Sequence, residues 1–141
     1  MAAGFVGGYL GYLLGQANYA LYKDFDAFVR AAGLQSIEWR ILATLNDSGP
    51  MPISVLAHEV LAKQPTLTKA VQRMVGNDWL ILCADAADQR RTLVSITGLG
   101  RNVIAPLLEE AQTHETRVLQ SLGDADTKAL KALLFKLTQL S

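Results

Sequence analysis

The chain has 141 residues, with 13 basic and 13 acidic side chains and no formal net charge, and 50% of its residues are hydrophobic. This length fits a single domain, and the zero net charge excludes a protein that is basic throughout. A monomer of this size would leave much apolar surface in water, so we expect a large hydrophobic subunit interface. The single cysteine, Cys83, excludes an internal disulfide and predicts a cytoplasmic protein.

The first 22 residues carry no charged side chain, a feature also typical of signal peptides and membrane segments. No basic residue opens this run, and five glycines dilute it. From Leu10 the apolar residues take helical spacing, which predicts a helix from about Leu10 to Ala31 with Gly33 just past its end. We interpret the segment as a frayed start, followed by a helix buried mostly against another subunit.

Three further helices are predicted before residue 77. The first begins after Ser36, buries Ile41, Leu42 and Leu45, and ends at the breaker cluster 47–50. The second is a short amphipathic segment over 54–60, with Ser54 as its N-cap and Val55, Leu56 and Val60 on its apolar side. Pro65 then fits the first position of the third, so the last two helices predict a helix-turn-helix.

The helix that follows Pro65 has two contrasting faces. Its apolar residues at i, i+3, i+4 and i+7 define a buried stripe, Leu67, Ala70, Val71 and Met74. The opposite arc carries two hydroxyls, one amide and two cations and no acid: Thr66, Thr68, Lys69, Gln72 and Arg73. Such a face suits a DNA major groove, although an ordinary solvated face explains it equally well in isolation. The neighbouring hairpin decides between the two.

A β-hairpin is predicted from the apolar or β-branched runs at 80–83 and 92–97. Its tip carries four charged residues, Asp85, Asp88, Arg90 and Arg91. A solvated tip explains charge, but it does not require two adjacent arginines. An arginine beside a short acid can be held extended and enter a narrow minor groove. The hairpin and the two preceding helices therefore predict a winged helix-turn-helix in a mainly α fold.

Two apolar helices close the chain. Thr97 is expected to cap a helix that runs to about Leu122, and a last helix follows Gly123 with leucines at helical spacing. The simplest assembly pairs the end helices of two subunits across a two-fold axis. The two recognition helices would then lie in major grooves about 34–36 Å apart and read a pseudo-palindrome. A monomer would leave the leucine stripes unused.

The charge is distributed as a local DNA contact requires. Residues 51–101 hold six cations and four acids, whereas 1–50 hold three and four, and 102–141 hold four and five. The positive excess is therefore confined to the helix-turn-helix and hairpin.

No enzymatic or metal site is predicted. The two histidines, His58 and His114, lie in different helices, and Glu110 with His114 at i, i+4 gives two metal ligands where zinc usually needs three or four from the protein. No P-loop, dinucleotide-binding glycine motif or nucleophile elbow is present, so we expect no catalysis and no cofactor. Cys83 follows Leu80, Ile81 and Leu82, which favours a packed, inert thiol over a redox sensor.

The hairpin segment 88–100, Asp-Gln-Arg-Arg-Thr-Leu-Val-Ser-Ile-Thr-Gly-Leu-Gly, resembles the wing signature of the MarR (multiple antibiotic resistance regulator) family. Leu56-Ala57 and Gln64–Lys69 are similar to that family's helix-turn-helix, and Leu34–Leu45 resembles the helix before it. The resemblance covers roughly residues 9–140 and implies one domain, 1–141. Within it, 1–33 and 99–141 would form dimerisation helices, and 34–98 would bind DNA.

The resemblance also implies site residues and a regulatory ligand. Arg90 would enter the minor groove with Asp88 holding it, and the other expected DNA contacts are Ser54, Gln64, Thr66, Thr68, Lys69, Gln72, Arg73 and Arg91. Family members respond to lipophilic or phenolic effectors, for which Tyr12, Tyr19 and Trp39 offer aromatic faces. This indicates a homodimeric repressor of double-stranded DNA that an effector releases. The alternative is a winged-helix protein–protein adaptor, which has no need of an acid-free arc.

Overall fold

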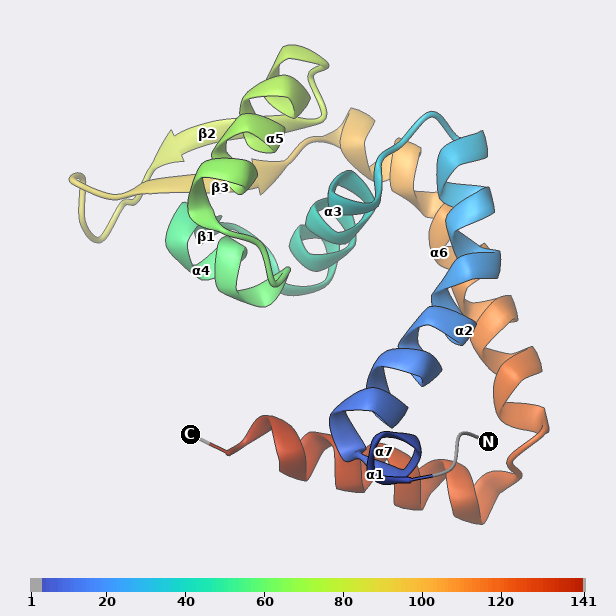
Figure 1. Ribbon diagram of the computed structural model, residues 1–141. Helices are drawn as coiled ribbons and strands as arrows, with labels where there is room; N and C mark the ends of the chain where they lie inside the picture. Colours follow the sequence, from blue (N-terminus) through green and yellow to red (C-terminus); the bar gives the residue numbers. More distant parts are fainter. Residues whose placement is uncertain (1–3, 141) are drawn as a thin grey trace. The chain divides into compact units, whose positions relative to one another are not determined.

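The computed structural model describes residues 4–140. This part of the chain contains seven α-helices and one three-stranded antiparallel sheet (Figure 1). In chain order the elements are α1 (Phe5–Gly8), α2 (Leu10–Ala31), α3 (Ser36–Ser48), β1 (Met51–Pro52), α4 (Ile53–Glu59), α5 (Gln64–Gly76), β2 (Leu80–Ala84), β3 (Thr92–Ile96), α6 (Gly98–Gln120) and α7 (Asp124–Thr138). The predicted mainly α fold with a hairpin wing is confirmed.

The chain divides into two compact units. One, which we call the reading head, runs from Asp26 to Leu108 and contains α3, α4, α5 and the whole sheet. The other, which we call the terminal unit, consists of the segments up to Phe25 and from Glu109 onward. Helices α2 and α6 each contribute residues to both units, so the division falls inside these two helices.

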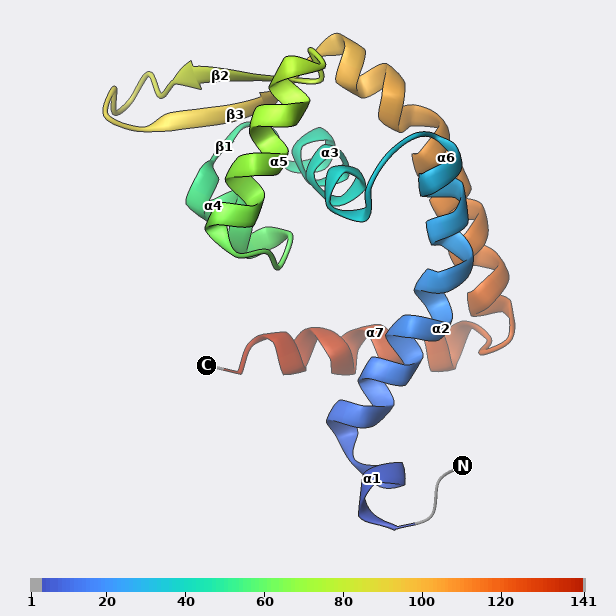
Figure 2. The same cartoon turned by 45° about the horizontal axis from the view of Figure 1, so that its top comes forward.

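The sheet of the reading head has the strand order β1-β3-β2. Strands β2 and β3 form the predicted hairpin, with Leu80 opposite Ile96 and Ala84 opposite Thr92. Strand β1 adds a third pairing, with Met51 opposite Val94. Strand β1 was not predicted, because two residues cannot show an alternating pattern. The hairpin extends away from α3, α4 and α5 as a free ribbon in both views (Figures 1 and 2).

The core of the reading head lies where α3, α4 and α5 meet the base of the hairpin. The predicted stripe of α5 is confirmed, since Leu67, Ala70, Val71 and Met74 are all buried. The predicted Ile41, Leu42 and Leu45 of α3 are buried as well. Helix α4 buries Leu56 and Ala57, and its C-cap Val60 is buried as well. Val55 is exposed, so its assignment to the apolar side was wrong.

Most helix ends follow the expected signals. The bounds of α2 match the prediction, and Gly33 past its end has φ +80°, a conformation that glycine adopts at little cost. Thr97 caps α6 as predicted, because its Oγ1 accepts a hydrogen bond from the Gly100 N–H at 3.0 Å. Helix α6 ends at Gln120, two residues before the expected Leu122.

The prediction of Ser54 as the N-cap of α4 was wrong. The helix begins at Ile53, and its N-cap is Pro52, which makes no side-chain cap hydrogen bond. Pro52 ends β1 in an extended conformation, so the chain turns directly from strand into helix. Ser54 consequently lies in the first turn of α4 and is exposed. Helix α3 likewise begins one residue earlier than predicted, with Gln35 as its N-cap.

The terminal unit is rich in exposed apolar side chains. Helix α7 has no buried residue, although one of its faces carries four leucines, Leu130, Leu133, Leu134 and Leu137. Leu140, just past the end of the helix, is also exposed. The start of α2 exposes Leu10, Leu13 and Leu14 in the same way. Within the part of the chain that the structure describes, no helix combines the length and apolar character that crossing a bilayer requires.

Candidate DNA-binding surface

Helix α5 presents a polar arc opposite its buried stripe. Thr66, Lys69 and Gln72 are exposed on this arc, and α5 contains no acidic residue. Thr68 is half-buried, and its hydroxyl donates to the Gln64 carbonyl oxygen at 2.9 Å. Because the hydroxyl uses its hydrogen in this bond, its oxygen can still accept a hydrogen bond.

The first turn of α5 adds a positive end to this arc. The N-cap Lys63 makes no side-chain cap hydrogen bond, and Gln64 and Pro65 are exposed beside it. The N-terminal N–H groups of a helix carry partial positive charge and bind anions. Together with Lys63 and Lys69, they form a surface suited to phosphate oxygens.

At the wing tip, Asp88 orients Arg90. Its Oδ1 accepts hydrogen bonds from the Arg90 backbone N–H at 3.1 Å and from Nε at 3.3 Å. The Arg90 side chain is 92% exposed, so the carboxylate holds the Nε side of the guanidinium and leaves the rest of that group in solvent. The neighbouring Arg91 is also exposed, and its N–H donates to the Asp88 carbonyl oxygen at 3.0 Å. The expected partnership of Asp88 with Arg90 is therefore present.

Arg73 differs from the other residues of the arc. Its Nε lies 3.4 Å from Glu38 Oε2, and its Nη2 donates to Gln35 Oε1 at 3.0 Å. Both partners belong to the start of α3, so two of the guanidinium nitrogens face the protein. Sequence reasoning missed Gln35 and Glu38. A signal was available, because Glu38 stands at helical spacing among Leu34, Ile41 and Leu45, which are buried.

The base of the wing is fixed by Thr97 and by a close approach at Gly100. The Thr97 hydroxyl donates to the Asp78 carbonyl oxygen at 2.6 Å, and the Thr97 N–H donates to the Trp79 carbonyl oxygen at 3.0 Å. A Cβ on Gly100 would lie 2.3 Å from that same Trp79 oxygen. Glycine is therefore required where α6 leaves the hairpin.

The turn between α4 and α5 carries a strained residue. Leu61 has φ +58° and is 86% exposed. A left-handed backbone conformation is unfavourable for a branched side chain, so α4 and α5 hold this turn in place. Beside it, Arg40 Nη1 of α3 donates to the Val60 carbonyl oxygen at the end of α4.

The prediction that Cys83 is packed was wrong, because its side chain is exposed. Strand β2 buries only Leu80, since the hairpin beyond it extends away from the helices. His58 is exposed and His114 is half-buried, with the ring of His114 6.1 Å from that of Phe25. Within residues 4–140, no group of three or more His, Cys, Asp or Glu side chains is placed to hold a metal ion.

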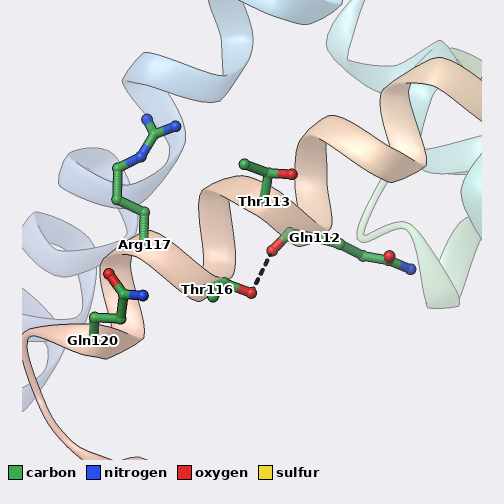
Figure 3. Close-up of a pocket in the computed structure, with 5 residues that line it drawn as sticks. All are labelled: Gln112, Thr113, Thr116, Arg117 and Gln120. Carbon is green, nitrogen blue, oxygen red and sulfur yellow. Dashed lines mark hydrogen bonds between the residues drawn. The ribbon is translucent and has the colours of Figure 1, made fainter.

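The three aromatic residues expected to meet an effector come from both units. Tyr12 and Tyr19 lie on α2 in the terminal unit, half-buried and exposed respectively, and Trp39 lies half-buried on α3 in the reading head. None of them lines the surface pocket of about 380 Å³ on α6, which is formed by Gln112, Thr113, Thr116, Arg117 and Gln120 (Figure 3). The residues around that pocket are polar or charged, and the Thr116 hydroxyl donates to the Gln112 carbonyl oxygen within it.

Comparison with known proteins agrees with this architecture. The model of the MarR family matches residues 34–92. The MarR family transcriptional regulator SPO1453 from Silicibacter pomeroyi DSS-3 is 37% identical, with a TM-score of 0.84 over 96% of this chain and 99% of that one. The transcriptional repressor IacR of Pseudomonas putida is 27% identical over 87% of this chain and 74% of its own length. NadR, solved in complex with 4-hydroxyphenylacetate, shares the fold, with 24% identity and a TM-score of 0.89 over the whole of both chains.

The helix pair, the hairpin beside it and their cationic surface define a winged helix-turn-helix DNA-binding protein. The chain belongs to the MarR family of transcriptional regulators.

Proposed function

We propose that this regulator is a homodimeric repressor that binds a pseudo-palindromic operator and is released by a small lipophilic or phenolic effector. Segments 1–33 and 99–141 would pair the subunits, and 34–98 would contact DNA, within a single functional domain. The observation that carries the proposal is the exposed, acid-free arc of α5 beside a wing whose Arg90 is oriented by Asp88.

The dimer is supported by the apolar faces of the terminal unit. A monomer would leave the leucine face of α7 and the start of α2 in water. Soluble monomers rarely expose continuous apolar patches of this kind, because burying them is favourable. Pairing two copies through these helices removes that surface from water and gives the assembly two reading heads. Two are needed because the small positive excess of one reading head gives only modest affinity for DNA.

The proposed DNA contacts fall into two groups. Thr66, Thr68, Lys69 and Gln72 of α5 meet base edges and phosphates of the major groove, and Ser54 and Gln64 meet the flanking backbone. Arg90 enters the adjacent minor groove, with Arg91 at its edge and Asp88 behind it. Arg73, also expected on this surface, is treated in the next subsection.

The test begins by selecting a binding site from random DNA duplexes with the purified protein. We expect a selected inverted repeat whose affinity falls steeply with salt, because bound cations release counterions. Arg90→Ala should lower the slope of log K against log salt by about one for each half-site. Arg117→Ala removes the same charge from the terminal unit and is the matched control. No selected sequence, or equal effects of the two substitutions, would contradict the proposal.

The effector is proposed to contact Tyr12, Tyr19 and Trp39. Aromatic rings with polar tips suit a phenolic acid, and the phenolic acid bound by NadR supports this class. The compound would bias the regulator toward an arrangement that binds DNA poorly. With 4-hydroxyphenylacetate as the probe, we expect quenching of Trp39 fluorescence in a Trp79→Phe background and release of the selected duplex. Quenching without release would contradict control by this ligand class.

The same account predicts a cytoplasmic protein without catalytic activity, cofactor or metal, since its residues serve DNA binding and subunit pairing. A protein–protein adaptor is the competing function. It would bind no selected duplex, and its affinity for a partner would not depend on Arg90.

A further inference from the structure

We propose that Glu38 of α3 is a positioning residue for DNA recognition, which holds the recognition helix α5 through Arg73. Arg73 then serves this link rather than a phosphate contact. The inference rests on the proposed DNA-binding function and assigns a role to two residues that the DNA-contact surface does not explain.

Both oxygens of the Glu38 carboxylate have a donor. Oε1 accepts the backbone N–H of Gln35 at 2.8 Å, at the N-terminus of α3. Oε2 accepts Arg73 Nε at 3.4 Å, and Gln35 Oε1 accepts Arg73 Nη2 at 3.0 Å. One carboxylate and one amide therefore connect the first turn of α3 to the last turn of α5, across 35 residues of sequence.

The burial of this pair is asymmetric. Only 6% of the Glu38 side chain is exposed, compared with 43% of the Arg73 side chain. A buried carboxylate is strongly unfavourable unless it is paired and hydrogen-bonded, so Arg73 cannot leave Glu38 for a phosphate without a penalty. An exposed cation such as Lys69 pays no such penalty when it meets DNA.

Helix α3 also holds the other helix of the reading pair. Arg40, two residues after Glu38, donates from Nη1 to the Val60 carbonyl oxygen at the end of α4. Apolar packing between the three helices is non-directional, whereas these polar contacts fix distance and angle. Glu38 and Arg40 thus fix the positions of α5 and α4 relative to α3. Base readout in the major groove depends on the position of α5.

The alternative is that Arg73 is an ordinary DNA cation that Glu38 partly neutralises. The two accounts predict opposite signs for Glu38→Gln. If Glu38 positions α5, the substitution weakens binding to the selected duplex. If Glu38 only competes with DNA for Arg73, the substitution frees a cation and strengthens binding.

The experiment measures affinity for the duplex selected by the parent protein and for a scrambled duplex of equal composition. We expect Glu38→Gln and Arg73→Lys each to weaken binding to the selected duplex about tenfold, equal to about 1.4 kcal/mol. Binding to the scrambled duplex should change little, because it depends mainly on charge. The double variant should lose no more than either single variant, since both break one link.

Two further measurements separate positioning from general damage. Arg73→Gln should leave the salt slope unchanged, whereas Lys69→Gln should lower it by about one for each half-site. Ile41→Val disturbs the buried face of α3 without touching Arg73. This control should lose about as much thermal stability as Glu38→Gln and keep full affinity for the selected duplex.

Tighter binding by Glu38→Gln, full affinity in Arg73→Lys, or a lower salt slope in Arg73→Gln would overturn the inference while leaving DNA binding intact. If the parent protein selects no duplex at all, the proposed function fails and this inference fails with it.

Discussion

Replacing Gly100 by alanine tests how closely α6 is fitted to the base of the wing. The new Cβ would lie 2.3 Å from the Trp79 carbonyl oxygen and 2.8 Å from Ile96 Cγ1. The oxygen cannot retreat freely, because it accepts the Thr97 N–H at 3.0 Å. The first turn of α6 must therefore move away from the hairpin.

The size of the effect follows from two opposing contributions. Overpacking of a well-packed site destabilises by about 1–3 kcal/mol. The helix propensity of alanine offsets up to about 1 kcal/mol of that loss. We therefore expect Gly100→Ala to lower the free energy of unfolding by about 1–2 kcal/mol.

Gly98→Ala is the matched control, because Gly98 lies in the same helical turn and a Cβ there would have nothing within 4 Å. That substitution should stabilise the protein by about 0.4–1 kcal/mol. Urea unfolding of both variants at one protein concentration measures the difference, since the stability of a dimer depends on concentration. Equal stabilities of the two variants would refute the close approach at Gly100.

Three other predictions concern the wing base, the turn and the subunit interface. Thr97→Ala should cost about 1–2 kcal/mol in urea unfolding, through loss of the bonds to Asp78 and Gly100, while Thr97→Ser keeps them. Leu61→Gly should raise the melting temperature, because relief of the left-handed strain is worth about 1–2 kcal/mol and exceeds the entropy cost of glycine. Leu133→Asp should give monomers in sedimentation, because it places a charge in the proposed subunit interface. Lys128→Glu, on the opposite arc of α7, should leave the dimer intact. A dimeric Leu133→Asp variant would show that the leucine face of α7 does not form the subunit interface.

Local patterns of the sequence predicted most of the reading head. The stripe Leu67, Ala70, Val71 and Met74 is buried as its spacing required, because an apolar period of 3.6 leaves a helix only one way to face the core. The bounds of α2 and the cap at Thr97 were also found, since glycine and threonine signals act within a few residues.

The features that sequence reasoning missed depend on distant partners or on very short segments. Strand β1 has two residues and exists because β3 pairs with it, and its presence moves the start of α4 ahead of Ser54. Cys83 was expected to be packed because its neighbours are apolar, but the hairpin leaves the helices at Leu80. Arg73 pairs with a residue 35 positions away, which no local pattern of charges can reveal.

The claim on which the function rests is that α5 and the wing contact one duplex. A photo-crosslinking side chain placed at Thr66 and, in a second variant, at Gln89 of the wing tip tests it directly on the selected site. We predict crosslinks from position 66 to bases read in the major groove and from position 89 to the adjacent minor groove of the same half-site. Crosslinks from only one of these positions, or from neither, would contradict the account.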